Sequence, residues 1–167
     1  MSLRTLVRQA CEVKSEEERW RLIAWSIAWE GCIGLRNPKK RGISPYVEIS
    51  NTSKEVLEKI VLLTNVGKIY VRKRYSLKHK VSWVWKVSKQ AEVKELLIKI
   101  KDFLPLRRKK CVADLVIEFC ELRTKTRACW SYHSQRELEI VKEIGELNRK
   151  GYRIINDNKE VEANVNP

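Results

Sequence analysis

The stretch Leu22-Ile-Ala-Trp-Ser-Ile-Ala-Trp-Glu-Gly31 is apolar almost all the way round a helix and ends in an acid and a glycine. A helix is predicted from about Glu16 to Glu30, because Ser15-Glu-Glu-Glu18 has the spacing of a capping box and glycine commonly follows the last helical residue. A helix that lies on one sheet needs only a single apolar stripe, so a second face of this helix must also be buried. Two interpretations stay open: a second copy around a two-fold axis, or other helices of the same chain.

Two segments with strand periodicity lie beyond this helix, and each reads as a hairpin. The first joins Cys32–Arg36 to Tyr46–Ser50 through a turn at Pro38–Gly42, and the second joins residues 68–74 to residues 82–88. The side chains expected to face inward are Ile33, Leu35, Val47, Ile49, Ile69, Val71, Trp83, Trp85 and Val87. Between the hairpins, Thr52-Ser-Lys-Glu55 has the pattern of a capping box that opens a helix ending near Gly67.

Three further helices are expected after the second hairpin. They run over about 91–103 and 107–123, and from a capping box at Ser134-Gln-Arg-Glu137 to Gly151. The order of helix, two strands, helix, two strands and helix, with helices appended, favours an α+β fold. One antiparallel sheet would then have helices on its inner face and an open outer face. We expect a single domain over residues 1–151 and a polar tail over residues 152–167.

Positive charge is concentrated on the predicted strands. Lysine and arginine total 35 against 21 acids, for a net charge of +14, yet no acid occurs between Glu30 and Glu48 or between Glu58 and Glu92. Ordinary surfaces mix both signs, so two basic hairpins indicate a nucleic-acid partner. Strands can enter the major groove of duplex DNA. A sheet that stacks RNA bases is the alternative, but it would need more outward aromatic residues than Tyr46 and Tyr70.

Other classes of protein fit the sequence poorly. No apolar run approaches the roughly 18 residues of a membrane-spanning helix. The segment MSLRTLVRQACEVK lacks the apolar region of a signal peptide, so an intracellular protein is expected, in the cytoplasm or nucleoid or in an organelle matrix. The five cysteines form no C-x-x-C pair, which argues against zinc and against a disulfide framework.

Glu30 is the candidate for chemistry. It follows a buried run and lies at the negative end of the helix dipole, a position that attracts cations. In a two-fold dimer, two Glu30 carboxylates would lie near the axis, where oxygen ligands could hold magnesium against a phosphate.

Ile23-Ala-Trp-Ser-Ile-Ala-Trp-Glu-Gly31 resembles the LAGLIDADG motif, and the order of elements resembles that of the LAGLIDADG homing endonucleases over about residues 19–151. Gly67–Arg72, Phe103–Lys109 and Leu147–Gly151 share in the resemblance. A single motif resembles the homodimeric, intron-encoded branch. The resemblance implies an αββαββα fold whose saddle-shaped sheet lies in the major groove of a long pseudo-palindromic DNA site. It also implies a homodimer through Leu22–Gly31 that cuts both strands with Mg2+ or another divalent cation such as Mn2+.

The resemblance assigns roles to individual residues. Glu30 matches the metal-binding acid, with the backbone carbonyl of Trp29 as a further ligand, and Asn51 matches a polar residue that orders water. Arg107 matches a basic residue beside the scissile phosphate, and Arg108 and Lys109 are close enough to compete for that role. The DNA-contacting residues are expected to be Arg36, Lys39, Lys40, Arg41, Tyr46, Glu48, Lys68, Tyr70, Arg72, Arg74, Lys80 and Lys86.

Some positions depart from the family pattern. Glu30 replaces the more usual aspartate, and Trp25 and Trp29 stand where the family often has small residues, so the dimer is expected to pack differently. Lys54 and Glu55 lie where another active-site arginine is expected, which leaves that role unassigned. One alternative function is a LAGLIDADG protein that binds without cutting, as an intron RNA maturase or a regulator. The other is a basic scaffold protein without enzyme activity.

Overall fold

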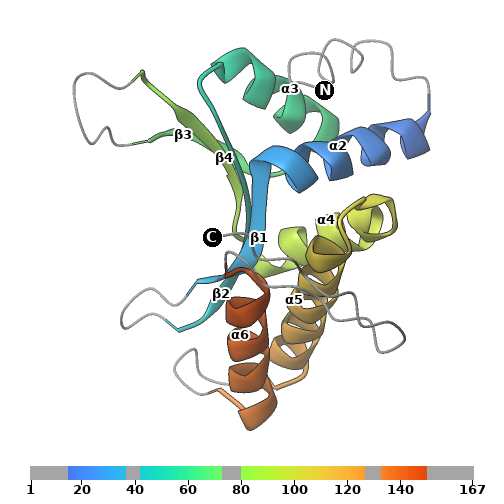
Figure 1. Cartoon of the computed structure of the whole chain (residues 1–167), viewed down its shortest axis with the longest axis vertical. Helices are drawn as coiled ribbons and strands as arrows, with labels where there is room; N and C mark the ends of the chain where they lie inside the picture. Colours follow the sequence, from blue (N-terminus) through green and yellow to red (C-terminus); the bar gives the residue numbers. More distant parts are fainter. Residues whose placement is uncertain (1–14, 37–41, 73–79, 127–132, 150–167) are drawn as a thin grey trace, which may run out of the picture.

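The computed structural model describes residues 15–36, 42–72, 80–126 and 133–149. Helix α2 (Glu16–Glu30) passes directly into strand β1 (Gly31–Arg36), with no loop between them (Figure 1). The remaining elements are β2 (Ser44–Asn51), α3 (Lys54–Thr64), β3 (Lys68–Val71), β4 (Trp83–Val87), α4 (Gln90–Ile100), the 3-10 turn η2 (Lys101–Phe103), α5 (Arg107–Thr126) and α6 (Gln135–Leu147). This order confirms the predicted α+β arrangement.

The four strands form one antiparallel sheet in the order β1-β2-β4-β3. The two hairpins therefore meet through their second strands, and β3 is an edge strand. One ladder row crosses the whole sheet, because Glu48 pairs with Cys32 on one side and with Lys86 on the other, and Lys86 pairs with Lys68. Side chains of this row point away from the core, so β2 and β4 present the centre of the outward face.

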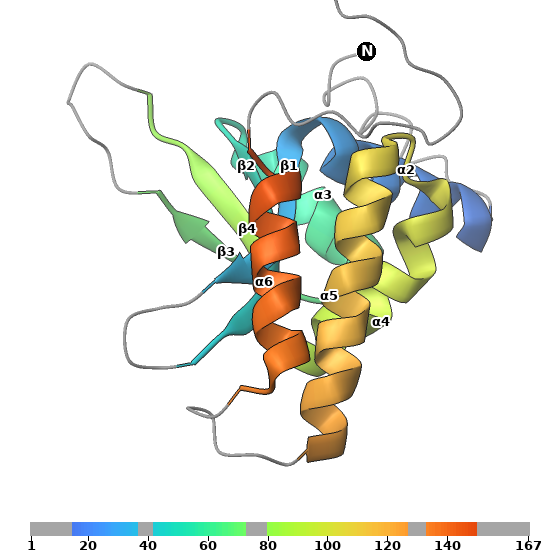
Figure 2. The ribbon, with the colours of Figure 1, turned by 60° about the horizontal axis from the view of Figure 1, so that its bottom comes forward.

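The helices cover the inner face of this sheet. Figure 2 shows α4, α5 and α6 gathered on one side, with the two hairpins extending from the other. Val47, Ile49, Trp85 and Val87 point toward the helices and are fully buried. Alternation along β2 confirms the predicted register, since Tyr46, Glu48 and Ser50 are only partly buried. None of the described helices covers the outward face.

Helix α2 begins and ends as its sequence predicts. The Ser15 hydroxyl accepts a hydrogen bond of 3.2 Å from the backbone N–H of Glu18. Gly31 follows in an extended conformation, which other residues can also adopt, so the backbone conformation does not require a glycine here. Its lack of a side chain matters instead, because an added Cβ would lie 2.8 Å from the Cα of Ile27 and 3.1 Å from the carbonyl oxygen of Glu48. The glycine permits close contact between the end of α2 and β2.

The predicted capping box at Thr52–Glu55 is wrong. Helix α3 has Ser53 as its N-cap, one residue later, without a side-chain capping bond. The cause lies at the end of β2, where Asn51 Oδ1 accepts a hydrogen bond of 2.8 Å from the Ser53 N–H and closes a turn. Glu55 instead forms an ion pair with Lys59 at 3.2 Å.

Several element boundaries also differ from the prediction. Helix α3 ends at Thr64 rather than near Gly67, because Asn65 adopts a left-handed conformation with φ of 54°. Val71, expected to be buried, is 61% exposed at the end of the edge strand. The capping box of α6 is confirmed, with both of its reciprocal hydrogen bonds, but α6 ends at Leu147. The turn residues 37–41 and the tail at 152–167 lie outside the described residues.

Candidate nucleic-acid interface and metal site

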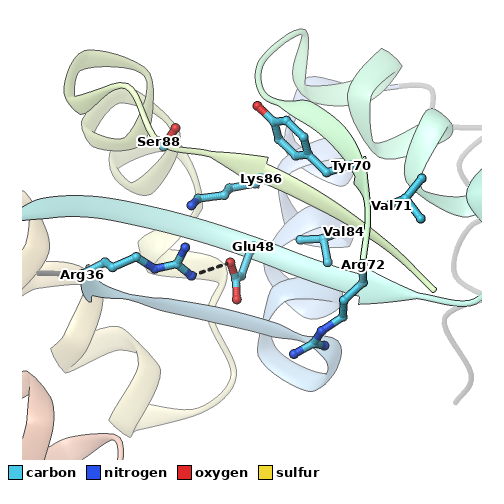
Figure 3. Close-up of a pocket in the computed structure, with 8 residues that line it drawn as sticks. All are labelled: Arg36, Glu48, Tyr70, Val71, Arg72, Val84, Lys86 and Ser88. Carbon is cyan, nitrogen blue, oxygen red and sulfur yellow. Dashed lines mark hydrogen bonds and ion pairs between the residues drawn. The ribbon is translucent and has the colours of Figure 1, made fainter. Parts of the chain in front are cut away.

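The outward face of the sheet is polar and mostly basic. Arg36, Glu48, Tyr70, Arg72 and Lys86 surround a depression of about 380 Å³ over β2, β3 and β4 (Figure 3). Arg72 donates a hydrogen bond of 3.3 Å to the Ser50 hydroxyl, which links the edge strand to β2. The cations of two hairpins that lie far apart in sequence are therefore brought together on one surface.

Arg36 is held in place on this face by two neighbours. Its Nη2 lies 3.3 Å from Oε2 of Glu48, and its Cζ lies 4.8 Å from the ring centroid of Tyr46. Lys86 approaches the same ring, with Nζ at 5.9 Å from the centroid. Partial burial and the nearby Arg36 lower the pKa of Lys86, while Glu48 opposes the shift. Crowding of cations around a single carboxylate is typical of a surface that meets an anionic partner.

Most of the predicted contact residues lie in the described part of the chain. Those on or beside the strands are Arg36, Tyr46, Glu48, Lys68, Tyr70, Arg72, Lys80 and Lys86, whereas Lys39, Lys40, Arg41 and Arg74 lie outside the described residues. Tyr70 is 52% exposed, as expected. Tyr46 is half-buried, and burial followed by contact with the Cys32 thiol raises its pKa. The Tyr46 ring therefore packs against Arg36, and less of it is accessible to a partner than of Tyr70.

Glu30 is exposed at the last position of α2. The preceding residue, Trp29, is 59% exposed, and its ring centroid lies 6.4 Å from that of Trp25. Among the described residues, no three His, Cys, Asp or Glu side chains lie close enough together to hold a metal ion. At the end of α2, the Glu30 carboxylate and the neighbouring backbone carbonyls are the available oxygen ligands.

Lys109 makes contacts at the end of α2, and its predicted role beside the scissile phosphate stays a prediction. Its ammonium donates hydrogen bonds of 2.6 Å to the carbonyl of Ile27 and 2.6 Å to that of Gly31. Burial, followed by the charge of Arg108, lowers the pKa of Lys109, and Cys32 opposes this shift. The ammonium thus caps the end of α2 beside Glu30. The sequence could not show this contact, because it joins positions about eighty residues apart.

The other two predicted catalytic residues are placed at the edges of this region. Arg107 is the first residue of α5, exposed, and has no hydrogen-bond or ion-pair partner among the described residues. Asn51 uses its Oδ1 in the turn to Ser53, so its proposed role in ordering water is left to its amide nitrogen. Lys54 pairs with Glu58 at 2.9 Å and lies over the ring of Trp83, which leaves the unassigned family role without an arginine here.

Solved structures share this architecture. The archaeal intron-encoded homing endonuclease I-Vdi141I, complexed with DNA, superposes with a TM-score of 0.66 at 21% identity, over 85% of this chain and 91% of that chain. The homing endonuclease I-CvuI, in complex with a DNA target, has a TM-score of 0.61 at 18% identity, over 84% and 88%. This chain has the LAGLIDADG homing-endonuclease fold. No protein-family model and no curated protein sequence matches it.

The LAGLIDADG fold of this chain corresponds to only part of some larger relatives. The LAGLIDADG meganuclease I-AabMI, bound to uncleaved DNA, is matched with a TM-score of 0.55 at 18% identity over 77% of this chain but 43% of that chain. The chain therefore spans nearly all of some LAGLIDADG structures and less than half of others. None of the described helices is long and apolar enough to cross a membrane, and Cys32, Cys111 and Cys120 are free thiols.

Proposed function

We propose that this protein is a site-specific DNA endonuclease that acts as a homodimer on a long pseudo-palindromic site. It would hydrolyse one phosphodiester in each strand with a divalent cation, Mg2+ or Mn2+. The observation that carries the proposal is the basic outward face of the sheet, continuous with the helix that ends in Glu30. Support comes also from the structures that share the fold, among them I-SmaMI bound to cleaved DNA.

The outward face suits duplex DNA. The major groove, about 12 Å wide, admits a two-stranded ribbon, and the β2–β4 pair forms the centre of this sheet. Lysine and arginine contacts to phosphates fix position along the duplex, while side chains in the groove contact base edges. A DNA target also supports an intracellular site of action, in the cytoplasm or nucleoid or in an organelle matrix, and an intron-encoded origin is part of the same proposal.

A two-fold dimer would complete the cutting site. Trp25 and Trp29 leave an apolar face of α2 uncovered, at 36% and 59% exposure. A relative matched over 43% of its length has room for two such units in one chain. Pairing two α2 helices would bring both copies of Glu30 toward the axis, which supplies the oxygen ligands that one chain lacks.

Each residue near Glu30 has a proposed task. Glu30 holds the divalent cation, together with the Trp29 carbonyl; such a cation supplies charge that polarises a phosphate and lowers the pKa of water. Arg107, exposed and unpaired within the described chain, stabilises the negative charge that develops on the phosphate. Lys109 keeps the last turn of α2 closed, so that the Glu30 carboxylate stays in place. Asn51 orders water at the end of β2.

The test compares Glu30→Gln with Glu17→Gln. The target is first selected from a randomised duplex library incubated with Mg2+ and the wild-type protein. We expect Glu30→Gln to lower the rate of cleavage by at least a hundredfold, in line with the loss of a catalytic group, while DNA binding changes little. Glu17→Gln removes the same charge at the far end of α2, where Glu17 pairs with Arg21, and should cut normally.

The outcomes separate the candidate functions. Unchanged cleavage by Glu30→Gln would show that Glu30 is not the metal-binding acid. Tight binding by the wild-type protein with no cleavage in Mg2+ or Mn2+ would instead indicate a non-cleaving protein of the same fold, such as an intron RNA maturase or regulator. Absence of binding to duplex DNA would refute the proposed endonuclease and leave an RNA-binding maturase as the remaining candidate.

A further inference from the structure

The outward face of the sheet carries a single carboxylate, that of Glu48. No other acid lies among the residues of the four described strands, nor anywhere in the sequence between Glu30 and Glu55. Glu48 occupies a central strand and pairs in the ladder with Cys32 and Lys86. A carboxylate at the centre of a phosphate-binding surface lowers its affinity for phosphate, so Glu48 is expected to have another role there.

Stability gives little reason. The Arg36–Glu48 contact is an exposed ion pair, with side chains 47% and 24% exposed, and such pairs contribute little to folding. Its effect on geometry is larger, because Glu48 on one side and the Tyr46 ring on the other fix the Arg36 guanidinium. In Figure 3 the two side chains lie side by side and point toward one another, from neighbouring strands. The pair is thus arranged before any partner binds.

The two groups also have complementary hydrogen-bonding chemistry. Arg36 carries donors beyond the Nη2 contact, and Glu48 uses Oε2 for that contact, which leaves Oε1 as an acceptor. In the major groove, guanine presents two acceptors, O6 and N7, and cytosine presents one donor, the N4 amino group.

We propose that Arg36 and Glu48 together recognise guanine and cytosine, at one base pair or at two stacked ones, in each half of the DNA site. Arg36 donates to O6 and N7 of guanine, and Glu48 accepts from N4 of cytosine. This inference rests on the proposed function, because it requires the sheet to lie in the major groove. Lys86 lies beside Glu48 in the ladder. Its ammonium is a compact charge that contacts a phosphate or a base acceptor without the fixed geometry of the Arg36 guanidinium.

The experiment measures base preference by binding alone, so that it does not depend on cleavage. The full chain is incubated with a randomised duplex library in Ca2+, and bound sequences are counted for wild type, Glu48→Gln, Arg36→Lys and Glu55→Gln. The wild type should select cytosine at one position of each half-site. In Glu48→Gln, the preference for cytosine over adenine at that position should fall by about tenfold, because glutamine pairs with adenine N6 and N7. Arg36→Lys should relax the neighbouring preference for guanine.

Glu55→Gln is the matched control, since it removes an equal charge on α3, where Glu55 pairs with Lys59, and should leave every preference unchanged. If Glu48→Gln tightens binding equally to all sequences, Glu48 acts only through its charge and the inference is overturned while the proposed function stands. If the wild type and Glu55→Gln bind no duplex at all, the proposed function fails and the inference fails with it.

Discussion

At the scale of single residues, the ammonium of Lys109 holds two backbone carbonyls at the junction of α2 and β1. Replacing it with methionine removes both charge-assisted hydrogen bonds, although the Ile27 carbonyl still accepts one from the Gly31 N–H. Because hydrogen bonds to a charged group contribute roughly 1.5–3 kcal/mol, we expect Lys109→Met to lower the free energy of unfolding by about 2 kcal/mol. Urea-induced unfolding, followed by circular dichroism, measures this difference.

The neighbouring residue provides the control for Lys109. Lys110→Met removes the same charge, but the described partner of the Lys110 ammonium is Asp102, in an exposed ion pair at 3.2 Å. Lys110→Met should therefore change the free energy of unfolding by less than about 0.5 kcal/mol. Equal stability of the two variants would mean that the α2 carbonyls do not need Lys109.

At the scale of elements, His133 connects the start of α6 to the start of β2. Its Nε2 accepts a hydrogen bond of 3.3 Å from the Ile43 N–H, so the imidazole must be neutral there. Burial, followed by the charge of Arg123, lowers the pKa of His133, and Glu137 opposes this. The folded state thus takes up the proton at lower pH than the unfolded chain, whose histidine pKa is about 6.5.

The sign of the resulting pH dependence follows. The contribution of His133 to stability is complete above about pH 6.5 and is lost as the pH falls below that value toward the lowered folded pKa. We expect the free energy of unfolding of the wild type to fall more steeply below pH 6.5 than that of His133→Gln, whose amide oxygen can still accept from Ile43. Denaturant unfolding at a series of pH values tests this, and parallel curves would contradict it.

The sequence predicted the elements well because each carries local information. Period-two alternation in β2 and the capping box at Ser134 depend on residues a few positions apart, and both are confirmed. Errors arose where a local pattern competed with a neighbouring turn, as when Asn51 displaced the expected cap at Thr52. The role of Lys109 at α2 was not predictable, because it depends on how α5 packs against the end of that helix. Glu30 was predicted from its position at a helix end, where the structure places it, and its metal-binding role stays a prediction.

At the scale of the whole molecule, the exposed tryptophan pair on α2 predicts a dimer. We expect the wild type to sediment as a dimer at micromolar concentration, and Trp25→Glu/Trp29→Glu to sediment as a monomer, because carboxylates in an apolar interface are costly to desolvate. Leu62→Glu is the control, since Leu62 is 81% exposed on α3 and should leave the dimer intact. A monomeric wild type would remove the basis for a shared site.

The contact at Gly31 has a consequence for how such a protein could change its target. Glu30 and β1 are consecutive in the chain, and the missing side chain at Gly31 lets the helix end pack directly on the backbone of Glu48. In the proposed enzyme, the spacing along the duplex between the contacted bases and the cut phosphate is then set by the backbone. New targets can therefore arise by exchanging outward side chains, while the length of the overhang stays constant.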